Sequence, residues 1–382
     1  MPYITIPATI RHHQLTIDDF LAVPGSKFSY SGPAGHIGDT RTYYQENPPE
    51  RLRSTEVAAN CITLLDQFVE RHSALYEVER ETLYHHFTIP KRNGKRRPID
   101  APLPQLMEAL RELKLIFEGA CCVLNHTSAF AYVKNRSTLE AVKRHQTNKS
   151  RWFLKTDCSD FFPSTTLQFT MNTISDIWPF SEIVKNEHGK AVLEKALDLC
   201  FLRGGLPQGT PISPMLTNLV MIPIDHDLMN GLRDFEGSHL IYTRYADDMQ
   251  ISARNEFDWQ KVCAYIQGVF KKHNAPYSLK REKTHYGSCA GRNWILGVMY
   301  NKDQQITLGK KRKDALRASI CDYMRNRGTR NALSYGDLQS LNGTISYFKK
   351  IEPEYTDGLL SHYSKKFDAN VLASLREDLR NI

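Results

Sequence analysis

The sequence lacks a long hydrophobic run and any internal repeat. No apolar stretch approaches the roughly 18 residues that a membrane-spanning helix needs. The N-terminus, Met1–Ile6, has no basic region followed by an apolar core, so we expect no signal peptide. These absences predict a cytoplasmic protein without a membrane partner.

Cysteines at metal-binding spacing are also missing. The eight cysteines are scattered, with no Cys-x-x-Cys motif and no paired histidine spacing. A zinc site and a disulfide framework are therefore both disfavoured. We expect reduced, largely buried cysteines.

The composition is that of a globular protein with a basic surplus. A chain of 382 residues is long enough for two or three subdomains. Hydrophobic residues make up 41% and charged residues 24%, which is ordinary. The net charge of +8 favours a polyanionic partner, although many basic proteins bind no nucleic acid.

Local patterns predict a mixture of helices and strands with no clear linker. Leu106, Leu110, Leu113 and Phe117 share one helical face, and Asn93-Gly94 is a strong hairpin turn signal. Expected helices cover residues 54–72, 106–117, a segment that opens with a capping box at 137–140, 258–272, a basic segment from 310, and a last region over 338–348. Expected strands cover residues 87–90, 97–99, 152–156 and 294–300.

Residues 302–330 form a basic stretch, with nine Lys or Arg against three Asp. One interpretation is a solvated helix face. The other is a surface that follows a nucleic-acid backbone.

The most informative stretch is Tyr245-Ala246-Asp247-Asp248. Short β-prone runs at 240–242 and 249–251 flank it, so the pattern predicts a hairpin with the acid pair at or near its tip. Adjacent like charges repel, and a fold that holds them together usually requires a cation. Divalent ions with oxygen ligands are the obvious candidates. A simple polar turn is the alternative, since Asp is common in turns.

Asp157 follows the buried strand expected at 152–156 and supplies a third carboxylate. Three converging acids are the ligand set of a two-metal phosphoryl transfer site, in which ions roughly 3.5–4 Å apart clamp the attacking and leaving oxygens. Mg²⁺ suits such a site because it binds a few carboxylates and completes its shell with phosphates and water. About ninety residues separate Asp157 from the acid pair, so the pattern predicts this convergence without showing it.

Three ordered segments resemble the palm motifs of a reverse transcriptase. They are Asp157-x-x-x-Phe161-Phe162, Gly-Leu-Pro-Gln-Gly-Thr-Pro-Ile-Ser-Pro at 205–214, and Tyr245–Asp248. The Gln-Gly-x-x-x-Ser-Pro form is similar to bacterial retron and group II intron types. Residues 279–284 resemble the next, lysine-bearing motif, residues 293–297 the primer-grip strand, and residues 91–98 and 130–137 the fingers segments. The resemblance covers roughly residues 85–350.

The resemblance implies a role for each catalytic residue. Asp157, Asp247 and Asp248 would bind two Mg²⁺ ions, and the backbone carbonyl of Cys158 would be a further ligand. The ions would activate the primer 3′-hydroxyl and neutralise the triphosphate. Lys283 would be the general acid toward pyrophosphate; a surface lysine in a charged run is the alternative.

The resemblance also implies the nucleotide contacts. Arg97, with Lys91 or Arg96 nearby, would contact the triphosphate, and the sequence leaves open which arginine does so. Gln208 and Gly209 would form the turn against the templating base and the nucleotide, where glycine permits close backbone approach.

Phe162 decides between polymer classes, and Tyr245 is a further substrate-binding residue by the same resemblance. By this resemblance, a large ring at position 162 would pack under the incoming sugar and leave no room for a 2′-hydroxyl, which favours deoxynucleotides; an ordinary core phenylalanine is the alternative. We expect Phe161 to be a core residue, because side chains alternate along an extended segment.

The subtype is inferred from what the chain does not contain. The Asn-Ala-x-x-His and Val-Thr-Gly elements usual in retron enzymes are absent. We also expect no endonuclease or maturase extension of the kind that a group II intron protein carries. The chain therefore resembles the retron-like "unknown group" of bacterial reverse transcriptases linked to phage defence. In that group the enzyme works with a dedicated structured noncoding RNA.

The expected fold is α+β, a right-hand polymerase with fingers, a palm on an antiparallel sheet and a helical thumb. We expect an N-terminal extension over 1–80 that contacts RNA, fingers and palm over 81–300, and a basic thumb region over 301–382. The expected partners are template RNA, dNTPs and the cDNA product. The alternatives are an RNA-binding scaffold, a template-independent nucleotidyl transferase or an RNA polymerase. Oligomeric state and priming mode stay open.

Overall fold

The computed structural model describes residues 51–90, 94, 96–119, 125–289, 296–301 and 304–381. They divide into two compact units, each assembled from segments that are distant in the sequence. The first unit takes the residues up to 137, 156–249 and 258–284, and the second takes 138–155, 250–257 and the residues from 285 onward.

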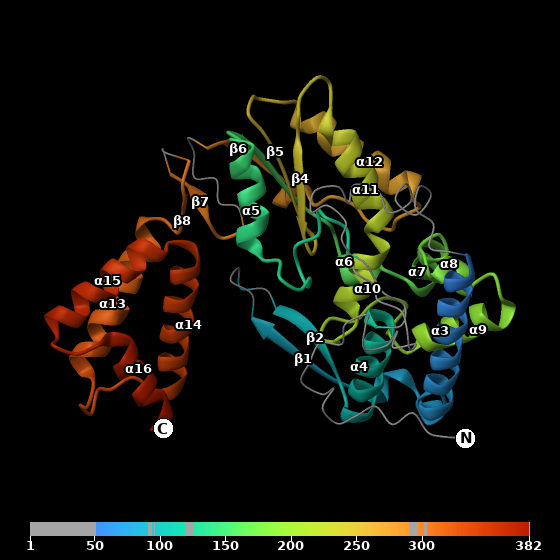
Figure 1. Cartoon of the computed structure of the whole chain (residues 1–382), viewed down its shortest axis with the longest axis horizontal. Helices are drawn as coiled ribbons and strands as arrows, with labels where there is room; N and C mark the ends of the chain where they lie inside the picture. Colours follow the sequence, from blue (N-terminus) through green and yellow to red (C-terminus); the bar gives the residue numbers. More distant parts are fainter. Residues whose placement is uncertain are drawn as a thin grey trace. The chain divides into compact units, whose positions relative to one another are not determined.

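The first unit contains an antiparallel hairpin and many helices (Figure 1). The hairpin pairs β1 (Tyr84–Pro90) with β2 (Arg96–Pro102), which confirms the two strands expected there. The apolar face predicted for α4 is fully buried at Leu106, Leu110, Leu113 and Phe117. The helices are α3 (Arg51–Arg71), η2 (Ser73–Tyr76), η3 (Arg80–Leu83), α4 (Pro104–Glu118), α6 (Phe161–Ser164), α7 (Leu167–Ile174), α8 (Phe180–Ile183), α9 (Glu187–Asp198), α10 (Ser213–Val220), α11 (Ile222–Arg233), α12 (Trp259–Lys272) and η4 (Arg281–Lys283).

A four-stranded sheet carries the acidic segments. Its order is β4 (Ile241–Tyr245), β5 (Asp248–Ala253), β3 (Trp152–Asp157) and β6 (His285–Ser288). β3 runs antiparallel to β6, and two residues join β4 to β5, which makes them a hairpin. The buried strand ending at Asp157 and the hairpin around the acid pair are therefore confirmed.

The second unit is built on an apolar cluster. It contains α5 (Thr138–Thr147), the short strands β7 (Met299–Tyr300) and β8 (Ile306–Thr307), and the helices α13 (Lys310–Asn326), α14 (Tyr335–Ile351), α15 (Pro353–Lys366) and α16 (Val371–Arg380). The face of α14 that carries Leu338, Leu341, Ile345 and Phe348 is buried in this cluster, as predicted. The sequence patterns did not predict α15 and α16.

The strand expected over residues 294–300 is shorter than predicted. Within its described part, Leu296 and Gly297 form a turn, Val298 makes a single β-bridge, and the strand itself covers Met299–Tyr300. Positive φ angles at both turn residues, 48° and 87°, take them out of the extended conformation.

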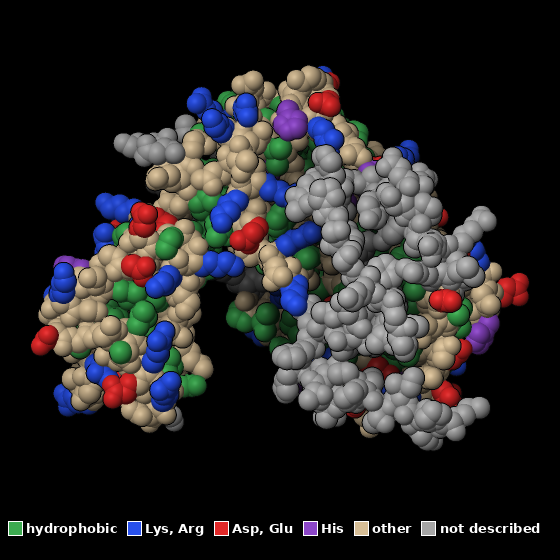
Figure 2. Space-filling model, viewed as in Figure 1, with side chains coloured by type: hydrophobic (Ala, Val, Ile, Leu, Met, Phe, Trp, Pro, Cys, Tyr) green, Lys and Arg blue, Asp and Glu red, His purple; other side chains and the backbone are tan. Residues whose placement is uncertain are grey.

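Several Lys and Arg side chains of the basic stretch form ion pairs within the second unit. Lys313 pairs with Glu352 at 2.5 Å, Arg317 with Asp314 at 3.1 Å, and Arg327 with Asp378 at 2.9 Å. Figure 2 accordingly shows basic and acidic side chains interspersed on the displayed face of these helices. Lys310, Lys311, Arg325 and Arg330 are exposed and make no ion pair with a described residue, so they are available to a polyanion.

No described helix is both long and apolar enough to cross a bilayer.

Candidate active site

Backbone hydrogen bonds bring Asp157 and Asp247 together in the first unit. Asp157 is the last residue of β3, and Asp247 lies in the two-residue turn between β4 and β5. The N–H of Cys158 donates to the carbonyl of Asp247 at 3.1 Å, and the N–H of Lys280 donates to the carbonyl of Asp157 at 2.9 Å. Two strand ends distant in the sequence thus place their carboxylates side by side.

The two carboxylates suit a cation. The pKa of Asp247 is raised, first by burial and then by the negative charge of Asp157. Asp157 is only 4% exposed, and its Oδ1 is buried without a hydrogen-bond partner among the described residues. A divalent ion would satisfy that oxygen and offset the like charges.

Two lysines face Asp157. Lys283 Nζ lies 2.6 Å from Oδ2, and Lys280 Nζ lies 3.4 Å from Oδ1. Burial alone would lower the pKa of Lys283, but the hydrogen bond and charge of Asp157, with the charges of Asp247 and Asp248, outweigh it and raise the pKa. Sequence reasoning singled out Lys283 and missed Lys280, because only the fold distinguishes two lysines three residues apart.

Asp248 is the first residue of β5, and its charge acts on Lys283. In the part of the chain that the structure describes, no three His, Cys, Asp or Glu side chains are arranged to hold a metal ion. The structure thus pairs Asp157 with Asp247, and the third ligand stays a prediction. The N–H of Cys158 points toward Asp247, and the Cys158 carbonyl as a metal ligand also stays a prediction.

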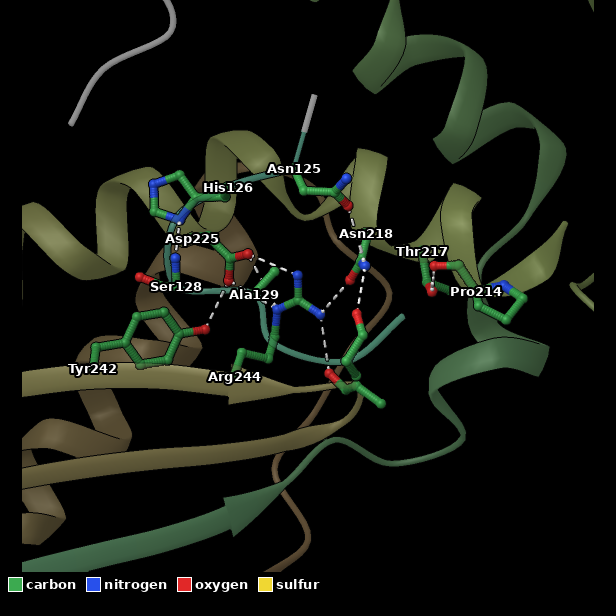
Figure 3. Close-up of polar contacts among 12 residues, drawn as sticks. Asn125, His126, Ser128, Ala129, Pro214, Thr217, Asn218, Asp225, Tyr242 and Arg244 are labelled. Atoms are coloured by element: carbon green, nitrogen blue, oxygen red, sulfur yellow. Dashed lines mark hydrogen bonds and ion pairs between the residues drawn. The ribbon is translucent and has the colours of Figure 1, made fainter. Parts of the chain in front are cut away.

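A fully buried polar network lies next to the acidic turn (Figure 3). Arg244 and Asp225 both have 0% side-chain exposure, and Arg244 Nη2 lies 2.7 Å from Asp225 Oδ2. Burial would lower the pKa of Arg244, but the charge and hydrogen bonds of Asp225 outweigh it and raise the pKa. Sequence reasoning missed these residues, because an arginine next to a strand pattern looks the same whether it is buried or exposed. Tyr245 follows Arg244 as the last residue of β4 and is half-buried.

Phe161 and Phe162 open a helical turn, so the extended backbone expected there is wrong. Phe161 and Phe162 are the first residues of α6, where neighbouring side chains are about 100° apart. Phe161 is a core residue, as expected: it is 3% exposed and its ring packs 5.0 Å from Tyr277. Phe162 is half-buried, and its role under the sugar stays a prediction.

The segment that contains Gln208 is hydrogen-bonded to the β1–β2 hairpin. The carbonyl of Gln208 accepts a hydrogen bond from Asp100 N at 2.9 Å. Gly209 has φ +124°, and a Cβ there would lie 2.9 Å from the carbonyl oxygen of Asp100. This glycine is therefore required by the close approach of β2, whether or not a nucleotide also comes close.

The structure separates the two adjacent arginines of β2. The side chain of Arg96 bonds back to Thr88, with Nη2 3.0 Å from the Thr88 carbonyl. Arg97 points to the opposite face of the strand and has no hydrogen bond or ion pair with a described residue. Arg97 is thus the arginine available to a ligand.

Tyr132 is an exposed aromatic residue that sequence reasoning did not select. It is 58% exposed and has φ 61°. Phe130 N donates to the Arg244 carbonyl at 2.8 Å, which sets this segment beside β4. The pKa of Tyr132 is raised, first by burial of its hydroxyl and then by the charge of Asp247.

Some sequence predictions lie outside the described residues. They are the N-terminal extension up to residue 50, Lys91, and the primer-grip residues Asn293, Trp294 and Ile295.

Comparison with known sequences decides the family. Residues 89–313 match the family model described as reverse transcriptase (RNA-dependent DNA polymerase), which covers more than half of the chain. The chain belongs to the reverse transcriptase family. The fold is therefore the α+β right-hand polymerase fold expected from the motifs, and the enzyme is an RNA-directed DNA polymerase.

The curated relatives are retron enzymes, which confirms the bacterial retron-type resemblance. Retron Ec73 reverse transcriptase of Escherichia coli is 28% identical over 243 residues, 62% of this chain and 74% of that one. Retron Ec83 reverse transcriptase of the same organism is 25% identical over 328 residues, 82% and 96% of the two chains. Among solved structures, apo telomerase from Candida tropicalis is 12% identical with a TM-score of 0.46, covering 76% of this chain and 62% of that one.

Proposed function

We propose that this reverse transcriptase copies RNA into DNA at a two-metal site held by Asp157 and Asp247, with Asp248 and the Cys158 carbonyl as further ligands. The observation that carries the proposal is the buried pair of carboxylates, one of which has an oxygen without a hydrogen bond. Two like charges held together in this way repel, and divalent ions would offset that repulsion more fully than Lys280 and Lys283, which both lie against Asp157 alone. Mg²⁺ bound there would supply the positive charge that activates the primer 3′-hydroxyl and neutralises the triphosphate.

The protein's own residues then have distinct tasks. Lys283 is an ammonium at neutral pH, its pKa is raised further by Asp157, and it would donate a proton to the departing pyrophosphate. Arg97 would bind the triphosphate through its exposed guanidinium. Phe162 would contact the sugar and exclude ribonucleotides, and Gln208, fastened to β2, would contact the templating base. Tyr245 would contact the primer end or the nucleotide from the end of β4.

Primer extension with purified protein tests this function. We expect deoxynucleotide incorporation that requires an RNA template and a divalent ion and is abolished by Asp247→Ala. Equal activity in that variant would contradict the proposed site. Efficient use of ribonucleotides would indicate an RNA polymerase, and incorporation without a template a nucleotidyl transferase.

We further propose that the template is a dedicated structured noncoding RNA and that the product serves antiphage defence. The likeness to retron reverse transcriptases supports the first part, and the resemblance to the "unknown group" supports the second. Sequencing the RNA and DNA that copurify with the protein tests the template: one abundant noncoding RNA with complementary DNA is expected, whereas random cellular RNA contradicts it. Phage plating on hosts with the wild type or Asp247→Ala tests the defence role, and equal plaque numbers would contradict it.

A further inference from the structure

The guanidinium of Arg244 is held in one orientation by several fully buried acceptors (Figure 3). Its Nε lies 2.9 Å from Asp225 Oδ1, and its Nη2 lies 2.7 Å from Asp225 Oδ2, so the two planar groups meet edge to edge. Nη1 donates to Asn218 Oδ1 at 3.1 Å. Tyr242 donates its hydroxyl to Asp225 Oδ1 at 2.8 Å and helps to hold the carboxylate.

One remaining contact of Arg244 reaches the acidic turn. Nη1 also donates to the carbonyl of Ala246 at 3.1 Å. Ala246 has φ 58°, an uncommon angle for a residue with a side chain. This carbonyl belongs to the peptide that enters Asp247, and the carbonyl that leaves Asp247 accepts from Cys158 N at 3.1 Å. Hydrogen bonds thus hold the peptide groups on both sides of Asp247.

The network also fastens a neighbouring segment. Asn218 Nδ2 donates to the carbonyl of Ala131 at 2.9 Å, and Arg244 N donates to the carbonyl of Ser128 at 2.7 Å. The side chain and the backbone of Arg244 therefore both hold the segment before Tyr132 next to the acidic turn: the backbone bonds to Ser128, and the side chain bonds to Asn218 and to the Ala246 carbonyl.

A contribution to stability alone does not explain a buried pair of this kind. Taking both charges out of water costs about as much as their attraction returns, and apolar residues of similar volume often stabilise a fold equally well. Apolar residues cannot, however, hold a carbonyl in a chosen direction. The directional contact to Ala246 is what the arginine supplies beyond packing.

We propose that Arg244 is a positioning residue that sets the orientation of Asp247 in the catalytic site, with Asp225 and Asn218 holding its guanidinium. The inference rests on the proposed function, since it assumes that Asp247 binds metal. Loss of the contact would let the turn relax away from its strained backbone angle, and Asp247 would no longer be aligned with Asp157.

Binding of Mn²⁺ to the purified chain, followed by electron paramagnetic resonance, tests the proposal without relying on activity. Arg244→Lys keeps the positive charge, but a single ammonium cannot bridge Asp225, Asn218 and the Ala246 carbonyl together. We expect its Mn²⁺ affinity to fall by about tenfold or more, the usual effect of removing a partner behind a metal ligand. In primer extension, kcat should fall and the KM for template should stay unchanged.

A matched control separates positioning from stability. Arg327 makes a similar two-pronged contact to Asp378 in the second unit, with Nε 2.9 Å from Oδ2 and Nη2 3.0 Å from Oδ1. Arg327→Lys should leave Mn²⁺ affinity unchanged at temperatures below its melting point. If Arg244→Lys fails to fold, the triple variant Arg244→Met, Asp225→Leu and Tyr242→Phe removes the buried charges and the stranded hydroxyl together, and the same affinity loss is expected in it.

The outcomes distinguish this inference from the proposed function. Tight Mn²⁺ binding in the wild type, lost in Asp157→Asn and Asp247→Asn but retained in the Arg244 variants, would overturn the role of Arg244 alone. Wild-type binding that is insensitive to both aspartate variants would overturn the proposed metal site, and the inference with it.

Discussion

At the turn between β4 and β5 the buried contacts are polar and directional, whereas in the C-terminal helices of the second unit they are apolar. Arg244 and Asp225 are fully buried and linked through hydrogen bonds. The second unit instead buries side chains such as Leu341 and Phe348. Apolar burial is favourable in many packings, while a hydrogen bond requires one geometry. The contrast predicts that changes near the turn affect chemistry first and that changes in the helices affect stability first.

The largest expected effect is the loss of Asp247. Asp247→Asn should lower the polymerisation rate by about 10³-fold or more, as removal of a catalytic group does. The melting temperature should not fall, because the variant removes one of two like charges whose proximity raises the pKa of Asp247. Primer extension and a thermal melt measure the two quantities. Asp234→Asn, an exposed carboxylate in the same unit, is the control and should change neither.

The apolar side of the comparison predicts the reverse behaviour. Phe348→Ala should lower the free energy of unfolding of the second unit by about 3–5 kcal/mol, because it removes a side chain that is 3% exposed. Urea unfolding measures this loss, and Mn²⁺ affinity below the transition should be unchanged. The neighbour Tyr347 is 37% exposed, so Tyr347→Ala should cost far less. Equal losses for the two variants would contradict the assigned core.

Backbone precision near the site can be tested at Gly209. Gly209→Ala places a Cβ against the Asp100 carbonyl at an angle that disfavours side chains, so we expect a cost of about 1–3 kcal/mol and a raised KM for dNTP. Gly204→Ala is the matched control, since Gly204 also has a positive φ, +81°, but no atom within 4 Å of an added Cβ. Its KM should match the wild type. A raised KM in both variants would trace the effect to the loop backbone and not to β2.

The adjacent arginines of β2 give a sharper test of directional contacts. Arg97→Ala should raise the KM for dNTP about tenfold, the effect of losing one hydrogen bond to a charged group. Arg96→Ala should change it little, because Arg96 already bonds to Thr88. Steady-state kinetics with varied dNTP measure both. The opposite ranking would reverse the assignment of Arg97 to the triphosphate.

His145 is a buried polar residue of the second unit, which is otherwise mostly apolar inside. Its substitution is expected to have the smallest effect on activity and stability at neutral pH. Burial, with Arg144, lowers the pKa of His145 to about 3, and its Nδ1 lies 2.6 Å from Ser252 Oγ. The unfolded chain binds a proton near pH 6.5, so stability is complete above that pH and falls as the pH drops toward 3, by up to about 1.4 kcal/mol per pH unit.

Urea unfolding between pH 7 and pH 4.5 measures this dependence. His145→Asn should flatten it, because asparagine does not titrate there. The exposed His362 is the control, and His362→Asn should keep the wild-type slope. An unchanged slope in His145→Asn would assign the acid sensitivity to other groups.

The sequence determined several of the longer elements and the identity of the candidate metal-binding groups. Apolar spacing was sufficient to predict α4 and the buried face of α14, and β-prone runs around Tyr245–Asp248 predicted the hairpin, because both periodicities are local. Ordered motifs then indicated the family. Short elements followed local backbone angles that no pattern reveals. For this reason the described part of the strand expected over 294–300 begins with a turn, and Phe161-Phe162 is helical.

Tertiary structure decided how the side chains of the candidate site are held. The approach of Asp157 to Asp247, the ion pairs of Lys280 and Lys283, and the choice between Arg96 and Arg97 all depend on contacts between residues distant in the sequence or on which face of a strand is covered. Arg244 is the clearest case. Its charge predicts exposure, and only the fold shows that Asp225, Asn218 and the Ala246 carbonyl enclose it, because burial is a property of the assembled chain and not of a residue.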